Sequence, residues 1–141
     1  LILGYLTISI FFLIPFLKDR VGKEVMFFGS LEEEVSRKVL DLTDEGDTTF
    51  AFGTMPHLYQ LTKTLPPGRV FVFQFPWFMK IAEDKIYEGL VLDPPKVVVR
   101  DKGSWVAGRN LVESSPRLNE YVEKYYKTVE VIDGVEIMLK R

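Results

Sequence analysis

The chain has 141 residues, and its 18 lysines and arginines against 20 aspartates and glutamates give a net charge of −2. This length suits a single domain, and the near balance of charge argues against a nucleic-acid-binding protein, which would show a clustered positive excess. Because 47% of the residues are hydrophobic, the chain is not a disordered one. The lack of cysteine excludes disulfides, thiolate zinc sites and a cysteine nucleophile, and a single histidine excludes a metal centre built on several histidines.

The first 17 residues, LILGYLTISIFFLIPFL, contain no charged side chain, and the run ends at Lys18. As a helix it would extend about 25 Å, slightly less than the ~30 Å hydrocarbon core of a bilayer. A signal peptide would need a charged segment before the run and a cleavage site after it, and a buried helix is seldom apolar on every face. We therefore interpret residues 1–20 as a truncated transmembrane helix. Since the sequence begins at Leu1, we expect it to be part of a longer protein.

Residues 21–141 are mixed in polarity and predict one soluble α/β domain without repeats or linkers. Ser30 and Glu33 have the spacing of a helix capping box, and apolar residues follow at intervals of three and four. A short strand is expected at 48–52, with a short helix after it. The run 70–75, VFVFQF, is apolar on nearly both faces, which is typical of a central strand covered on two sides.

The second half of the chain continues the alternation. A helix is expected from Pro76, a buried strand at 96–100, and a helix capped by Ser115. Asp133 and Gly134 form a strong type I′ turn signal between two apolar strands. The order of elements predicts an α/β fold: a small three-layer sheet, mostly parallel, with a carboxyl-terminal antiparallel hairpin at its edge.

The sequence contains no complete catalytic constellation, Gly-rich phosphate loop or metal-ligand spacing, so we assign no catalytic residue and no metal ligand. His57 could line a crevice at the carboxyl edge of the parallel sheet, or be a capping or partly exposed histidine without a ligand. Tyr59 could contact a ligand or be a half-buried core residue. Arg69 could hold a phosphate or a carboxylate, or form a salt bridge with Asp44 or Glu45.

The order of the segments is itself informative. An apolar run and a capped helix precede FAFGTMPHLYQLTKTLPPGRVFVF, then come a helix ending in LDPPKVVV and a hairpin whose last strand is EIMLKR. This order resembles the last transmembrane helix and the carboxyl-terminal domain of multi-pass glycosyltransferases with a GT-C fold. Relatives of the protein O-mannosyltransferases and the lipid A aminoarabinose transferases belong to that group. The positions that match its pattern are Gly53, Pro56, Tyr59, Lys63, Pro66, Pro67 and Arg69, then Pro94, Pro95 and 97–99.

The resemblance implies an enzyme that transfers a sugar from a polyprenyl-phosphate donor at the outer face of a membrane. The domain would then be extracytoplasmic and associate with membrane lipid, although the basic residues after the apolar run favour the opposite orientation. In that group the catalytic acidic residues lie in loops between earlier membrane helices, and some members use a divalent metal. This stretch would hold no cofactor and would cap the membrane active site, with His57, Tyr59 and Arg69 as candidate substrate-binding residues.

Two other hypotheses stay open. The chain could be a membrane-tethered, non-enzymatic α/β binding or sensor module whose ligand lies at the carboxyl edge of the sheet. It could also be a purely structural domain of a multi-pass protein. The sequence upstream of Leu1 separates these hypotheses, because the transferase requires many more apolar spans than a tethered module.

Overall fold

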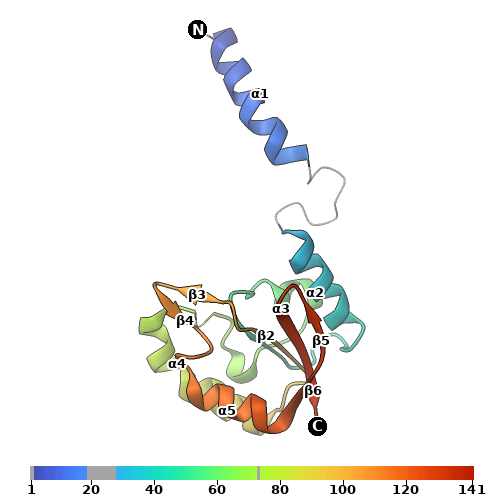
Figure 1. The fold of residues 1–141 in the computed structure, drawn as a ribbon. Coiled ribbons are helices and arrows are strands. Elements are labelled where there is room, and N and C mark those ends of the chain that lie inside the picture. The colour runs from blue at the N-terminus through green and yellow to red at the C-terminus, as the bar shows by residue number, and fades with distance from the viewer. Residues whose placement is uncertain (1, 19–27, 73) are drawn as a thin grey trace.

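The computed structural model describes residues 2–18, 28–72 and 74–141, and Figure 1 shows their arrangement. They form an α/β domain with a mixed sheet, preceded by a separate helix. In chain order the elements are α1 (Ile2–Lys18), α2 (Ser30–Leu40), β1 (Thr49–Phe52), α3 (Leu58–Thr62), the 3-10 helix η1 (Pro67–Arg69), α4 (Pro76–Leu92), β2 (Val97–Asp101), β3 (Trp105–Val106), β4 (Arg109–Asn110), α5 (Pro116–Tyr125), β5 (Tyr126–Ile132) and β6 (Val135–Lys140).

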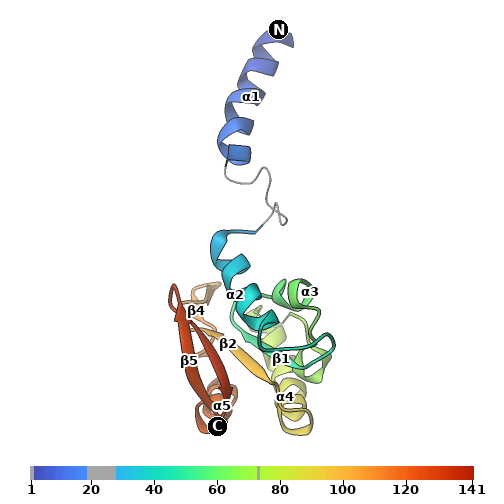
Figure 2. The same ribbon diagram turned by 90° about the vertical axis from the view of Figure 1, so that its right-hand side faces the viewer.

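The main sheet has four strands in the order β1–β2–β6–β5, with β1 and β5 at its edges (Figure 2). Strands β1 and β2 are parallel, whereas β6 is antiparallel to both of its neighbours. The prediction of a mostly parallel sheet is therefore wrong. The physical reason is that the carboxyl-terminal hairpin pairs with β2 through β6 and supplies half of the strands. A separate two-stranded ladder joins β3 to β4.

The segment 70–75, predicted to be a central strand, is not a strand in the part that the structure describes; residue 73 lies outside that part. The backbone of Arg69, just before it, has a positive φ of 59°. Phe71 and Phe75 are about half exposed. Val70 packs in the core on the side of α4 but does not join the sheet, so the apolar composition of this segment does not reflect a strand.

Two apolar cores cover the opposite faces of the sheet. Helices α2 and α3 lie on one face, and α4 and α5 lie on the other (Figure 1). Strand β1 contributes to both cores because alternate side chains of a strand point to opposite faces. Phe50 and Phe52 pack on the side of α4 and α5, whereas Ala51 packs on the side of α2 and α3.

The helix starts differ in detail from the expected caps. The residue before α2 is Gly29, whose backbone N–H donates a hydrogen bond of 3.0 Å to the carboxylate of Glu32. The capping interaction thus lies one residue earlier than the predicted pair, Ser30 and Glu33. Ser115 precedes α5 as expected but forms no capping hydrogen bond with its side chain.

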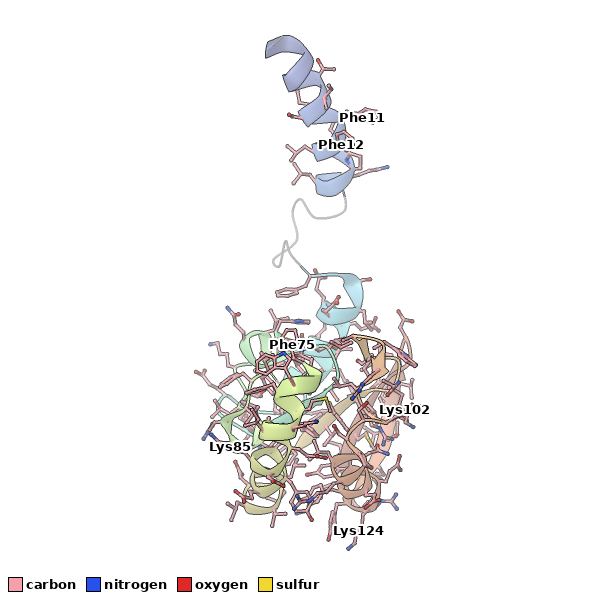
Figure 3. The ribbon with its side chains drawn as sticks, turned by 90° about the vertical axis from the view of Figure 1, so that its left-hand side faces the viewer. Phe11, Phe12, Phe75, Lys85, Lys102 and Lys124 are labelled. Carbon is pink, nitrogen blue, oxygen red and sulfur yellow. The ribbon has the colours of Figure 1, made fainter. Side chains whose placement is uncertain are left out.

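Helix α1 stands apart from the rest of the fold (Figures 1 and 2). Most of its described apolar side chains are exposed, among them Phe11 and Phe12, which are labelled in Figure 3. Over the described residues, no helix has both the length and the apolar character needed to cross a membrane. The interpretation of residues 1–20 as a transmembrane helix is therefore wrong. The 17 residues of α1 rise about 25 Å, which falls short of a ~30 Å hydrocarbon core.

Candidate functional site

Tyr59 lies in the core between α3 and β1. It is 4% exposed, and its hydroxyl accepts a hydrogen bond of 3.0 Å from the backbone N–H of Ala51. Burial raises the pKa of the Tyr59 hydroxyl above its ordinary value. The ring of Phe71 meets the Tyr59 ring edge-on, with centroids 5.7 Å apart. Because its ring and hydroxyl are both enclosed, Tyr59 holds α3 against the sheet.

His57 lies just before α3 and is half-buried. Its ring stacks on the ring of Phe28 with centroids 4.6 Å apart. Its Nε2 atom is buried and has no hydrogen-bond partner among the described residues. Burial lowers the pKa of the imidazole, and the charge of Glu32 partly offsets that effect. The structure therefore favours a neutral ring with one unused nitrogen.

Arg69 ends η1, and its side chain is exposed. In the described part of the chain its guanidinium has no ion pair, so the alternative of a salt bridge with Asp44 or Glu45 is wrong. Those two carboxylates lie near other cations, Asp44 at 3.4 Å from Lys96 and Glu45 at 3.5 Å from Lys63. Arg69 is thus the one sequence-predicted site residue whose charged group points freely into solvent.

The position of Arg69 is set by a close approach of η1 to α4. A Cβ atom on Gly89 would lie 2.0 Å from the backbone nitrogen of Gly68, and one on Gly68 would lie 2.3 Å from the carbonyl oxygen of Lys85. Both distances are far shorter than a van der Waals contact. Two glycines therefore allow the turn to rest directly on the helix, which fixes where Arg69 emerges. Across the described residues, no hydrogen bond, ion pair or ring contact joins Arg69 to His57 or Tyr59.

The carboxyl edge of the parallel pair, where His57 could have lined a ligand crevice, is occupied by a polar network. The carboxylate of Asp101 accepts hydrogen bonds from the backbone N–H of Gly103 at 2.9 Å and from the Ser104 hydroxyl at 2.6 Å. The Ser104 oxygen accepts a further bond of 3.1 Å from the N–H of Thr54. A Cβ atom on Gly53 would lie 2.8 Å from Cβ of Asp101. These contacts fill the space directly beyond the two strands.

Sequence reasoning missed a buried arginine. Arg100 in β2 is 1% exposed and donates hydrogen bonds to Glu136 at 2.6 Å, Glu123 at 2.6 Å and Asn119 at 2.9 Å. Burial raises the pKa of Glu136, but the hydrogen bonds from Arg100 and Lys102 outweigh it, so the pKa is lowered overall. Since the buried charge is fully paired, Arg100 links β2 to β6 and α5. No motif in KVVVR distinguishes it from an exposed strand end.

A pocket of about 120 Å³ lies between α4 and the β3–β4 ladder, and sequence reasoning did not find it. It is lined by Gln74, Met79, Lys80, Glu83, Val106, Arg109, Leu111 and Ser114. A more open depression shares Lys80 and Arg109 with it and adds Trp77. Within the described ranges neither cation has an ion pair, and Oε1 of Glu83 is buried without a hydrogen-bond partner. The lining residues come from two separate stretches of the chain, 74–83 and 106–114, and neither contains a motif, so no sequence signal marked them.

An exposed apolar surface adjoins this depression; we call it the aromatic face. Its members come from the residue before α4 and from the first turns of that helix: Phe75, Trp77 and Ile81. The rings of Phe75 and Trp77 stack with centroids 6.1 Å apart. Figure 3 shows Phe75 at the start of α4, at the end of the domain where the chain enters α2. Such a surface is unusual in a protein that has no partner.

The search for a metal-binding group and the comparisons with known proteins identify no further site in the part of the chain that the structure describes. No group of three or more aspartates, glutamates or histidines in the part of the chain that the structure describes could hold a metal ion. Comparison with protein families, with curated proteins and with solved structures found no match. The resemblance to GT-C glycosyltransferases therefore stays a prediction from the sequence.

Proposed function

We propose that this chain is the carboxyl-terminal part of a membrane glycosyltransferase that uses a polyprenyl-phosphate sugar as donor. Its α/β domain would cap the membrane active site on the extracytoplasmic side. The observation that carries the proposal is the conformation of the segment from Gly53 to Arg69. Two residues of this segment stabilise the fold: Tyr59 is hydrogen-bonded in the core, and Gly68 packs against α4. Arg69, in contrast, is exposed and has no ion pair among the described residues.

The backbone of Arg69 supports this assignment. A non-glycine residue at positive φ costs on the order of 1 kcal/mol and persists where the surrounding structure imposes it, often at a functional site. A guanidinium is also suited to phosphate, because its planar fork can donate two parallel hydrogen bonds to phosphate oxygens. Arg69 would bind the donor phosphate, with His57 as a second contact and Tyr59 as the residue that positions α3.

The role of the domain follows from the chemistry of the donor. A lipid-linked sugar reacts at the bilayer surface, and the site must exclude bulk water so that the sugar is not lost to hydrolysis. A rigid cap provides that shield without supplying catalytic groups. The catalytic carboxylates, and any divalent metal, would belong to other parts of the full-length enzyme.

The test is the rate of sugar transfer from a polyprenyl-phosphate sugar by the full-length protein. We expect Arg69→Ala to lower transfer about tenfold or more, because a hydrogen bond to a charged group contributes about 1.5–3 kcal/mol. The transfer rate of Arg69→Lys should lie between those of the wild type and Arg69→Ala, since lysine keeps the charge but lacks the planar guanidinium that donates two parallel hydrogen bonds. Arg117→Ala is the matched control, because Arg117 is a surface arginine of α5 that is paired with Asp84 and is not part of the segment from Gly53 to Arg69. Wild-type transfer by Arg69→Ala at equal abundance would contradict the assignment.

A non-enzymatic binding or sensor module is the second candidate. The observation that favours it is the pocket between α4 and the β3–β4 ladder, with a buried carboxyl oxygen and two cations that have no ion pair among the described residues. A full-length protein with no transfer activity towards any polyprenyl-phosphate sugar, but with a ligand bound in this pocket, would favour the module over the transferase.

A further inference from the structure

We propose that the aromatic face is a membrane-docking surface that lies in the interfacial layer of a bilayer containing anionic phospholipids. Lys80 and Arg109 would then lie beside the lipid phosphates. This inference goes beyond the proposed function, because it concerns how the domain meets the membrane and does not depend on sugar transfer. It also does not require α1 to cross the bilayer.

The exposed apolar side chains are large and lie on one side of α4. Trp77 is 68% exposed and Ile81 is 71% exposed, and residues four apart in a helix share a face. Phe75 stacks on Trp77 and extends the surface beyond the helix start. Tryptophan is enriched where proteins meet the headgroup layer, because its ring is apolar and its N–H can bond to water or to lipid oxygens. The face therefore has the composition of an interfacial surface.

The charges around the aromatic face complement anionic lipid. Lys80 and Arg109 lie in the same depression as Trp77. Two carboxylates of α4 lie close by: Glu83 lines the pocket beside these cations with its Oε1 atom buried, and the charge of Asp84 is paired at 2.6 Å with Arg117. Long basic side chains beside rings can reach phosphates while the rings enter the apolar layer. This combination favours a lipid surface over a protein partner, for which the two cations would need matching carboxylates.

The placement of the face in the fold agrees with this partner. Figure 3 shows Phe75 at the end of the domain where the chain enters α2. The contact of Gly68 with Gly89 holds η1 on α4, and Trp77 and Ile81 lie on α4 itself. Side chains carried by a formed helix need little ordering of the backbone when they dock, which favours binding. One end of the domain thus presents an aromatic and basic surface.

The experiment measures the depth of Trp77 in vesicles with the full chain. The chain has two tryptophans, so Trp105→Phe leaves Trp77 as the only tryptophan, and excitation at the red edge of the absorption band avoids the tyrosines. We expect its emission to shift to the blue and to be quenched by lipids brominated on their acyl chains. Quenching should be stronger with phosphatidylglycerol mixed into phosphatidylcholine than with phosphatidylcholine alone. Replacing Lys80 and Arg109 by glutamine should weaken binding to the mixed vesicles about fivefold for each charge removed.

The matched control places the emitter elsewhere on the same domain. Val131 on β5 is also exposed, and the variant W77F/W105F/V131W should show no quenching. Because the readout is local, binding of vesicles through α1 does not affect it. An unquenched Trp77 would overturn the proposal, as would a blue shift without lipid that grows with protein concentration, since a second copy would then cover the face. Equal quenching in neutral and anionic vesicles would overturn the role of Lys80 and Arg109.

Discussion

The folded structure around His57 lowers the tendency of its ring to bind a proton. Its ring is half-buried on Phe28, and Nε2 has no partner among the described residues. A buried imidazole is more easily accommodated neutral than charged. The carboxylate of Glu32 acts in the other direction but does not outweigh burial, so the pKa is lowered. Protonation of His57 at mildly acidic pH should therefore lower the free energy of unfolding.

We predict that His57 titrates below its ordinary pKa of 6.5. The unfolded chain then binds the proton more readily than the folded one, so stability is full above about pH 6.5 and is lost as pH falls through the lowered pKa. Since this is the only histidine, its ring resonance in an NMR titration gives the pKa directly. His57→Phe keeps the stacked ring, so its free energy of unfolding should fall less than that of the wild type below pH 6.5. A titration midpoint at or above 6.5 would refute the prediction.

Sequence reasoning identified polar residues at the surface better than polar residues in the core. It left Tyr59 open between ligand contact and core, and the hydrogen bond to Ala51 decides for the core. It gave no sign of Arg100, because the partners of that arginine come from β6 and α5, far along the chain. The pocket around Lys80 and Arg109 was missed for the same reason. Sites assembled from distant segments become visible only when the topology is known.

At the scale of elements, short sequence motifs correctly predicted where a helix begins and where a turn lies. Pro76 begins α4 as expected, and Asp133 and Gly134 have the positive φ values, 44° and 85°, that a type I′ turn requires. The prediction of a central strand at 70–75 was wrong because an apolar run is compatible with burial in a sheet and also with contact to a partner. The prediction of a mostly parallel sheet was wrong because strand order depends on contacts between distant segments, here between β2 and β6.

The contact between η1 and α4 gives a prediction at this scale. Glycine inside a helix ordinarily costs about 1 kcal/mol relative to alanine, so Gly89→Ala would stabilise an isolated helix. Here its Cβ would overlap the backbone of Gly68, and we expect a net loss of about 2 kcal/mol in the free energy of unfolding. Urea unfolding measures it. Glu88→Ala, at the neighbouring exposed position, should be nearly neutral, and a stabilised Gly89→Ala would show that η1 does not rest on the helix.

At the scale of the whole molecule, both faces of the sheet must be covered. The central strands carry buried valines on each side: Val98 faces α4 and α5, while Val97 and Val99 face α2 and α3. Without a helical layer on one side, such strands would expose a large apolar patch. This requirement could be deduced from the runs of apolar residues, whereas the assignment of helices to faces needed the structure.

The two cores predict which part of the chain is sufficient to fold. Among the residues that the structure describes, every member of both cores and every partly buried residue packed on them lies at or after Leu31, so no described side chain of α1 belongs to either core. We expect a chain of residues 28–141, which keeps Phe28 and the Gly29 cap of α2, to melt within about 4 °C of the full chain, equivalent to less than 1 kcal/mol. Thermal unfolding followed by circular dichroism measures Tm. A chain that begins at 42 lacks α2, uncovers Val97 and Val99, and should not fold cooperatively; equal Tm values for the two shortened chains would show that α2 is not part of the core.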